Sequence, residues 1–371
     1  MREGWTYKRL SEVCDKGASN IVINKLEDNN GAYPLFGASG LVKNVDFYHQ
    51  DKPYIGIVKD GAGVGRVNTY PAYSSLVGTM QYIFPKEECL LNYIKYFLIK
   101  LDLSHCVSGA TIPHIYFKDY GKSLIPVPPL SEQQSIVAEL DKINELISLK
   151  KSQMNDLDAL AQSIFYDMFG DPVVNEKGWE MKPWKQLLET KLGKMLDKAK
   201  QDVNAKLFPY LANLNVQWGY FDLSDIRTMP FSEQEMEKFR LKDGDLMICE
   251  GGESGRCAIW KATDNDMFFQ KAVHRARVID KSVTNIVYIR YLLEYTKKGD
   301  GLKDYITKST IEHLTGEKLN KLPIPLPPLP LQQSFAAKIE AIERQKQQVK
   351  QSLKDLETLL ASRMQYWFEE E

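Results

Sequence analysis

The sequence predicts an α+β fold in which two mixed α/β domains are separated by two long antiparallel α-helices. The helices form an intramolecular coiled coil, and the chain as a whole is a pseudo-twofold internal repeat. One observation is a repeated segment: residues 124–135 (LIPVPPLSEQQS) recur as residues 323–334 (PIPLPPLPLQQS), at an offset of 199 positions. Another is that a long stretch with apolar residues at helical spacing follows each copy. Because a fixed offset indicates copies of one structural plan, each half is predicted to be a globular part followed by a helix.

Four segments follow from the repeat. Residues 1–123 and 173–321 are the two predicted globular domains, and residues 124–172 and 322–371 are the two helical segments. The helical segments together carry a net charge of −6, whereas the domains carry +2 and +3. Mildly basic domains have the sign expected of surfaces that meet phosphate, although ordinary solvated surfaces carry such excesses as well.

Composition narrows the class of protein. Hydrophobic residues make up 43% of the 371 residues, which is enough for real cores. The five cysteines are odd in number and lack CxxC spacing, which predicts reduced thiols rather than a disulfide framework or a zinc site. No segment resembles a signal peptide or approaches the roughly 18 apolar residues of a membrane span. We therefore expect a cytoplasmic protein with no membrane association, metal or cofactor.

Short apolar runs predict strands inside the domains, and aromatic-rich stretches predict one packed helix in each. The strands are expected at residues 54–58, 80–84 and 245–249, and the helices at residues 91–98 and 286–293. Glycine-rich loops follow two of the strands, at residues 59–66 and 250–256. The first loop lacks the GK[ST] ending of a P-loop, and Arg66 stands where a GxGxxG fingerprint has its last glycine. The histidines form no metal-binding spacing, so the sequence predicts no enzyme active site.

The long helices carry a narrow apolar stripe with 4-3-4-3 spacing, which is typical of a coiled coil. In the first helix the stripe consists of Ile136, Leu140, Ile143, Ile147, Lys150, Met154, Leu157, Ala161, Ile164 and Met168. In the second it consists of Phe335, Ile339, Ile342, Lys346, Val349, Leu353, Leu356, Leu360, Arg363 and Trp367. The other copy in the same chain is the obvious partner. Lys150 and Lys346 interrupt the stripes; they either set the register or extend past their neighbours to solvent.

The start of each helix is also predicted. Pro126, Pro128 and Pro129 favour an extended, polyproline-like segment before the first helix. Ser131 and Gln134 then match a capping box, in which each side chain bonds the other residue's backbone. Pro330 replaces the serine in the second copy, so the second helix is expected to fray more readily.

Taken together, these features resemble the specificity subunit of a type I restriction-modification system. The resemblance covers nearly the whole chain and lies mainly in residues 124–172 and 323–368. The sequence Gly109-Ala110-Thr111-Ile112-Pro113-His114 is similar to the family's glycine-threonine-proline-histidine turn. The second half departs from this turn, because Glu312 stands in place of the proline.

The resemblance implies a non-catalytic subunit. In such a protein each globular domain is a target-recognition domain that reads one half of a split double-stranded DNA sequence. The helices act as a spacer and as the docking surface for two methyltransferase subunits, which join with restriction subunits in the complete enzyme. Independently, residues 136–168 would form roughly 50 Å of helix at about 1.5 Å per residue. Domains held by such a frame could address major-groove segments about 34 Å apart.

A competing hypothesis is a non-enzymatic coiled-coil scaffold with two protein-binding or peptide-binding heads. Salt-dependent binding to duplex DNA would separate the two hypotheses, because phosphate contacts release counterions.

We expect DNA contacts from basic and polar residues at the glycine loops and turns, where the backbone can approach phosphate. The candidates are Lys59, Arg66, Thr111 and His114 in the first domain and Arg256, Lys271, His274, Arg275 and Arg277 in the second. The alternative is that they are ordinary surface charges or, for His114, a histidine bonded within its turn.

We expect the partner subunits to bind apolar residues outside the stripes, which could complete a larger helical bundle. These candidates are Leu146, Leu149, Leu160, Phe165, Leu359 and Met364. Alternatively, they pack against the globular domains of their own chain.

Overall fold

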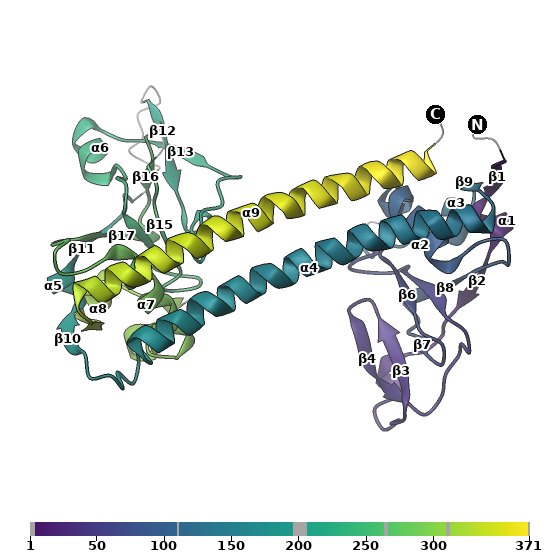
Figure 1. Cartoon of the computed structure of the whole chain (residues 1–371), viewed down its shortest axis with the longest axis horizontal. Helices are drawn as coiled ribbons and strands as arrows, with labels where there is room; N and C mark the ends of the chain where they lie inside the picture. The colour runs from purple at the N-terminus through teal and green to yellow at the C-terminus, as the bar shows by residue number, and fades with distance from the viewer. Residues whose placement is uncertain (1–3, 110, 196–205, 263–265, 309–311, 370–371) are drawn as a thin grey trace. The chain divides into compact units, whose positions relative to one another are not determined.

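A computed structural model describes residues 4–109, 111–195, 206–262, 266–308 and 312–369. The chain divides into two compact units. Unit 1 comprises Met1–Gln153 and Gln348–Glu371, and unit 2 comprises Met154–Gln347. Each unit therefore contains one globular part together with a portion of each long helix, α4 (Leu130–Phe169) and α9 (Leu329–Phe368), which can be followed in Figure 1.

The globular part of unit 1 contains three small sheets. A four-stranded sheet has the order β2-β8-β5-β6, a three-stranded sheet has the order β4-β3-β7, and β1 pairs antiparallel with β9. The strands are β1 (Thr6–Arg9), β2 (Cys14–Ala18), β3 (Tyr33–Gly37), β4 (Gly40–Val45), β5 (Tyr54–Val58), β6 (Val67–Tyr70), β7 (Ser75–Leu76), β8 (Met80–Pro85) and β9 (Leu124–Val127). The helices are α1 (Leu10–Val13), α2 (Leu91–Leu101) and α3 (Phe117–Tyr120), with 3-10 turns η1 (Ile23–Lys25) and η2 (Leu103–Cys106).

Unit 2 repeats the strand order of these three sheets and adds the antiparallel pair β18-β19. Its four-stranded sheet has the order β11-β17-β14-β15, its three-stranded sheet has the order β13-β12-β16, and β10 pairs antiparallel with β20. The strands are β10 (Glu180–Pro183), β11 (Leu188–Leu192), β12 (Leu207–Leu211), β13 (Arg227–Pro230), β14 (Leu246–Cys249), β15 (Cys257–Ile259), β16 (Phe268–Phe269), β17 (Val273–Val278), β18 (Thr307–Lys308), β19 (Glu312–His313) and β20 (Pro323–Leu326). The helices are α5 (Trp184–Leu187), α6 (Glu233–Phe239), α7 (Ile286–Lys298) and α8 (Gly316–Lys321), with 3-10 turns η4 (Asn213–Asn215) and η5 (Lys303–Tyr305). The shared strand order confirms the predicted internal repeat.

The strands and helices expected inside the domains are present. The run 54–58 is β5, which is buried at every position because both faces of this strand are covered. The runs 80–84 and 245–249 fall on β8 and β14, and the two aromatic-rich stretches fall on α2 and α7. The buried tyrosines of α2 and α7 belong to the domain cores, as their helical spacing predicted.

Inside each unit the two long helices pack side by side and antiparallel. In unit 1, Glu139 of α4 forms an ion pair with Arg363 of α9 and accepts a hydrogen bond from Trp367 Nε1 (2.9 Å). In unit 2, Phe335 near the start of α9 contacts Phe165 near the end of α4, with ring centroids 5.6 Å apart. In both units the residue number falls along α9 as it rises along α4, which is the direction predicted from the paired stripes.

Lys346 links the two helices within unit 2. Its ammonium group lies 2.5 Å from Asp158 of α4 and 3.1 Å from Glu343 of its own helix. Burial opposes the charged form, but the bond to Asp158 and the two carboxylate charges outweigh it, so the pKa of Lys346 is raised. This contact favours a register-setting role for Lys346. Lys150, by contrast, donates to Gln153 on its own helix, 3.1 Å away.

The predicted capping box is wrong. Helix α4 begins at Leu130, where the carbonyl of Pro129 accepts from the Gln133 N–H (3.0 Å), so Ser131 lies inside the first turn. Helix α9 begins at the equivalent Leu329, so the second helix does not start later than the first. Strands β9 and β20 precede the helices, because each proline-rich segment pairs with the first strand of its domain.

The first glutamine of each Gln-Gln pair ties the helix to its own domain. The buried Gln133 side chain donates to the carbonyls of Pro128 (2.9 Å) and Glu88 (2.8 Å) and accepts from the Leu90 N–H (2.9 Å). Gln332 repeats these contacts in unit 2, where it accepts from the Asn285 N–H (2.8 Å). The repeated glutamine therefore joins the start of each long helix to the segment that begins α2 or α7.

Two of the six expected docking residues are buried, which corrects their assignment. Phe165 is 0% exposed and packs on Phe335 and on Tyr288 and Tyr295 of α7. Met364 is buried in the apolar core of unit 1. The stripe shifts near the end of α4, because α7 covers a second side of the helix there. Consequently Phe165 and Phe169 are buried more deeply than Ile164 and Met168.

Candidate nucleic-acid interface

In unit 1 the glycine loop and the glycine-threonine-proline-histidine turn are joined by backbone hydrogen bonds. The Gly61 N–H donates to the carbonyl of Pro113 (2.9 Å), and the Ile115 N–H donates to the carbonyl of Lys59 (2.9 Å). The turn itself is closed by two bonds between Ser108 and His114. Ala110, in the middle of the turn, lies outside the described residues. The structure thus places two predicted DNA-binding segments, which are about fifty residues apart in sequence, on one surface.

The end of this loop requires glycine. Gly65 has φ +87°, and its N–H donates to the carbonyl of Val58 (2.8 Å), which closes the loop on the end of β5. A Cβ at this position would lie 3.4 Å from Leu103, and a positive φ is unfavourable for any residue with a side chain. In unit 2, Gly255 has φ +92° and bonds the carbonyl of Cys249 (3.0 Å).

The second loop is therefore built like the first, and Arg66 and Arg256 occupy equivalent positions. Each arginine carbonyl accepts from the last residue of the preceding strand, Val58 (3.0 Å) or Cys249 (2.8 Å). A bridge between Gly251 and His313 joins this loop to the second turn, as Asp60 and His114 join the first pair. Residues 309–311 of the second turn lie outside the described residues.

The predicted side chains of unit 1 lie at or near the surface. Thr111 is exposed at the turn, and Lys59 forms an ion pair with the adjacent Asp60. His114 is half-buried, with Nδ1 3.1 Å from the carbonyl oxygen of Ile112. The exposed Arg66 side chain folds over Gly63, where a Cβ would lie only 2.0 Å from its Nη2. Its Nη1 donates to the carbonyl of Ala38 in a long bond of 3.4 Å.

Arg256 is held much more tightly than Arg66. Its side chain is only 16% exposed, and it donates to the carbonyl of Asn213 (2.9 Å) and pairs with Glu253 (3.5 Å). Glu253 also accepts from Trp218 Nε1 (2.5 Å). The equivalent arginines therefore have different surroundings.

The basic cluster expected at residues 271–277 is only partly at the surface, because β17 is an inner strand of its sheet. Lys271, before the strand, is exposed, whereas His274 and Arg275 are 1% and 2% exposed. Arg275 pairs with Glu189 (3.0 Å), and His274 Nε2 lies 3.0 Å from the carbonyl oxygen of Leu314. Burial lowers the pKa of both side chains. We correct the expectation for these two residues, whose side chains are enclosed by the protein.

Arg277 lies near the end of the same strand, and its side chain pairs with Asp245. Its Nε and Nη2 lie 2.5 and 2.8 Å from the two oxygens of the buried carboxylate. This bidentate pair fixes the guanidinium against the domain.

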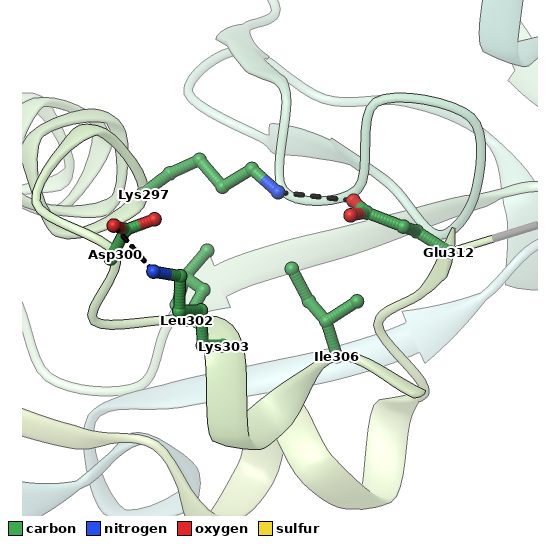
Figure 2. A pocket seen from close by; sticks show the side chains of 6 residues that line it. All are labelled: Lys297, Asp300, Leu302, Lys303, Ile306 and Glu312. Atoms are coloured by element: carbon green, nitrogen blue, oxygen red, sulfur yellow. Dashed lines mark hydrogen bonds and ion pairs between the residues drawn. The ribbon is translucent and has the colours of Figure 1, made fainter. Parts of the chain in front are cut away.

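A small cavity of about 80 Å³ adjoins the second turn in unit 2. Figure 2 shows Lys297 reaching Glu312, 3.2 Å away, and Lys303 paired with Asp300 (2.6 Å). Leu302 and Ile306 complete its lining. Glu312, which replaces the proline of the first turn, is therefore engaged with α7 through Lys297.

An open hollow of about 470 Å³ lies beside Arg66 in unit 1, between the β3–β4 turn and β6. Of its polar lining, only Arg66 was a candidate from the sequence; Ser39, Asn68 and Thr69 were not. It is lined by Phe36, Ala38, Ser39, Gly40, Arg66, Asn68, Thr69, Tyr70 and Pro71. Asn68 could have been found from strand periodicity, since Arg66 and Asn68 are exposed while Val67 between them is buried.

The remaining docking candidates are exposed leucines of the long helices. Leu146, Leu149 and Leu359 lie in unit 1 and Leu160 lies in unit 2. Exposed leucines grouped on a helix favour a binding surface for an apolar partner.

Within the described part of the chain, no group of three or more His, Cys, Asp or Glu side chains could hold a metal ion. Among the helices of the described residues, none combines the length and apolar composition needed to cross a membrane.

A family model described as "Type I restriction modification DNA specificity domain" matches residues 2–159 and 176–358. The chain belongs to this family. Specificity subunits among its relatives include the EcoKI subunit of Escherichia coli K12, which is 22% identical over 269 residues. The MjaVIII subunit of Methanocaldococcus jannaschii is 24% identical over 405 residues.

Coverage differs among these relatives. The match spans 68% of this chain and 58% of the EcoKI subunit. For the MjaIX subunit of Methanocaldococcus jannaschii, which is 27% identical, the shares are 70% and 64%. The chain thus spans less than two thirds of these two relatives, but the MjaVIII match spans 96% of the chain and 92% of the relative.

Solved specificity-subunit structures have the same fold. The S subunit of a type I restriction-modification system from M. genitalium matches with a TM-score of 0.60 and 15% identity, over 99% of this chain and 96% of that chain. A chain from a study of assembly and conformational transition of the type I R-M system matches with a TM-score of 0.59 and 17% identity, over 98% and 97%. These matches show the fold class predicted from the sequence.

Proposed function

We propose that this chain is the DNA-recognition subunit of a type I restriction-modification complex. It reads a bipartite, asymmetric target in double-stranded DNA, has no catalytic activity of its own, and acts in the cytoplasm, where the DNA is. Methyltransferase subunits, one for each repeat, and restriction subunits assemble with it. The family match favours this function over a scaffold with peptide-binding heads.

The observation that carries the proposal is a pair of domains with one strand order and different loops at equivalent positions. Arg66 is exposed where Arg256 is enclosed, and Pro113 of the first turn is replaced by Glu312 in the second. Two domains with the same strand order but different surface side chains suit two half-sites of different sequence, because base readout depends on the side chains placed in each groove.

We assign residues 1–123 and 173–321 to target recognition and residues 124–172 and 322–371 to the helical frame. In the first domain the proposed contacts are Lys59, Arg66, Thr111 and His114, which two joined loops bring to one surface. In the second we retain Lys271, which is exposed. Arg256 and Arg277 are held by carboxylates and shape the surface, and His274 and Arg275 belong to the interior.

For the methyltransferase subunits we propose docking on the exposed leucines of the long helices. In unit 1 these are Leu146 and Leu149 on α4 and Leu359 on α9, and in unit 2 it is Leu160 on α4. An amphipathic partner helix that covers these leucines would extend the helical pair into a bundle.

Selection from a library of duplexes with a randomised core of about 30 base pairs tests the recognition function. The purified full chain, alone and with its methyltransferase subunit, should enrich two different short motifs at a fixed spacing. Affinity should fall steeply as the salt concentration rises, because phosphate contacts release counterions. Enrichment of no motif, with equal affinity for all duplexes, would refute sequence recognition. Methyl transfer by the chain alone would refute the non-catalytic role.

A further inference from the structure

The hollow beside Arg66 presents two side chains, Arg66 and Asn68, whose polar groups can form hydrogen bonds with base edges. Arg66 immediately precedes β6 and Asn68 is the second residue of this strand; both are exposed and line the hollow, while Val67 between them is buried. Alternate residues of a strand point to the same face, so the guanidinium and the amide belong to one surface. The nine residues that line the hollow include one arginine and no Asp or Glu, which gives it the sign of charge that suits DNA.

Both side chains are already oriented by their neighbours. The Asn68 side chain lies beside the Tyr70 hydroxyl: burial raises the pKa of this hydroxyl, and its interaction with Asn68 opposes that shift. The Arg66 side chain lies over Gly63. The hydrogen bond from its Nη1 to the carbonyl of Ala38 is 3.4 Å long, which is weak enough to be exchanged for a bond to a ligand. Oriented side chains lose less conformational entropy when they bind.

The equivalent surface of unit 2 is covered. Strands β3 and β4 are joined by the two residues Ala38 and Ser39, but residues 212–226 separate β12 from β13. This longer connection packs on β15: the Gly219 N–H donates to the carbonyl of Cys257 (2.9 Å), and Phe221 packs on Trp260 with ring centroids 5.1 Å apart.

The two residues of unit 2 that are equivalent to Arg66 and Asn68 have different surroundings for this reason. Ala258, which is equivalent to Asn68, is fully buried, and Arg256 donates to Asn213 of the same connection. The two domains thus share a frame, but only unit 1 offers this reading surface among the residues that the structure describes.

We propose that Arg66 and Asn68 are the specificity-determining residues of the first domain, and that they read two purines through the major groove. This inference rests on the proposed DNA-recognition function. Arginine suits the O6 and N7 acceptors of guanine, and asparagine suits the N6 donor and N7 acceptor of adenine. Side chains two residues apart on a strand are about 6.6 Å apart. Bases two steps apart on one DNA strand are separated by about 6.8 Å.

The test compares the motifs that the wild-type chain and its variants enrich from the randomised duplex library. Arg66→Lys keeps the positive charge but loses the planar fork, so it should abolish one guanine preference while the affinity for unrelated duplexes stays near that of the wild type. Asn68→Ala should abolish one adenine preference in the same half-site. Each lost preference should be about 5- to 150-fold. The other half-site should be unchanged.

Arg227→Ala is the matched control, because it removes an exposed arginine of β13 that contacts Asp225 and lies outside the proposed interface. It should enrich the wild-type motif. If Arg66→Lys and Asn68→Ala also enrich the wild-type motif, or if they lower the affinity for all duplexes equally, the two residues do not read bases. The recognition function stands in either case. If the wild-type chain enriches no motif, the recognition function itself is wrong, and this inference with it.

Discussion

Replacing Phe165 with alanine should destabilise unit 2 without removing a partner-binding residue. The ring is fully buried, and its centroid lies 4.9 Å from that of Tyr295 and 5.6 Å from that of Phe335. Truncating a buried phenylalanine costs about 3–5 kcal/mol, because apolar area is lost and a cavity remains. In a unit of this size each kcal/mol shifts the Tm by about 2–4 °C. The expected decrease in Tm is therefore about 6–20 °C.

Thermal unfolding gives the size of the effect, and hydrogen exchange locates it. Peptides from α7 should exchange faster in the variant, because the aromatic contacts of this helix with α4 are lost. Leu149→Ala is the control: Leu149 is 57% exposed on the same helix, so its removal should change stability by less than about 0.5 kcal/mol. The packing argument is refuted if Phe165→Ala melts like Leu149→Ala while losing the methyltransferase subunit.

Three further predictions concern the docking surface, the buried glutamine and pH. The double variant Leu146→Asp, Leu149→Asp should lose the co-purifying methyltransferase subunit and keep its circular dichroism spectrum; retained co-purification would count against this surface. Gln332→Leu should lower the free energy of unfolding, measured in urea, by about 3 kcal/mol or more, because it leaves buried backbone groups unpaired. Gln333→Leu, at the exposed neighbouring residue, should be nearly neutral. Equal urea midpoints for the two variants would contradict the role of Gln332. Burial lowers the pKa of His274 in the folded state below its ordinary value near 6.5, so the unfolded state binds the proton first. Unit 2 should therefore lose stability as the pH falls below about 6.5, and His274→Gln should flatten the dependence of Tm on pH; parallel curves would exclude His274 as the cause.

The spacing of apolar residues predicted the parts of the fold in which one kind of neighbour determines which residues are buried. The coiled-coil stripes and the run 54–58 were found because one partner helix, or two covered sheet faces, decides which residues are buried. The prediction failed at Phe165, where α7 supplies a second neighbour that the spacing along α4 does not reveal. The motif Ser131 to Gln134 resembled a cap by spacing, but the structure uses the preceding Gln133 for a contact with a distant segment.

The candidate site was predicted in part for similar reasons. Loop positions could be found from glycines, since Gly65 and Gly255 satisfy a local requirement for positive φ. The solvent accessibility of the basic residues could not be predicted, because His274 and Arg275 lie on an inner strand whose neighbouring strands are distant in sequence. The connection at residues 212–226 left one signal in the sequence. Gly4-Trp5 recurs as Gly178-Trp179 at an offset of 174, which is smaller than the offset of 199 between the proline-rich segments that end the domains.

The pairing of β1 with β9 and of β10 with β20 has a consequence for how such proteins diversify. In each domain the first strand lies beside the last strand before the long helix, so the chain enters and leaves the domain through a single two-stranded ribbon. The loops between these strands can change without altering the helix that follows, provided that α2 or α7 and the segment bonded by the buried glutamine are kept. Selection for a new DNA target and selection for subunit assembly can therefore act on different parts of the polypeptide.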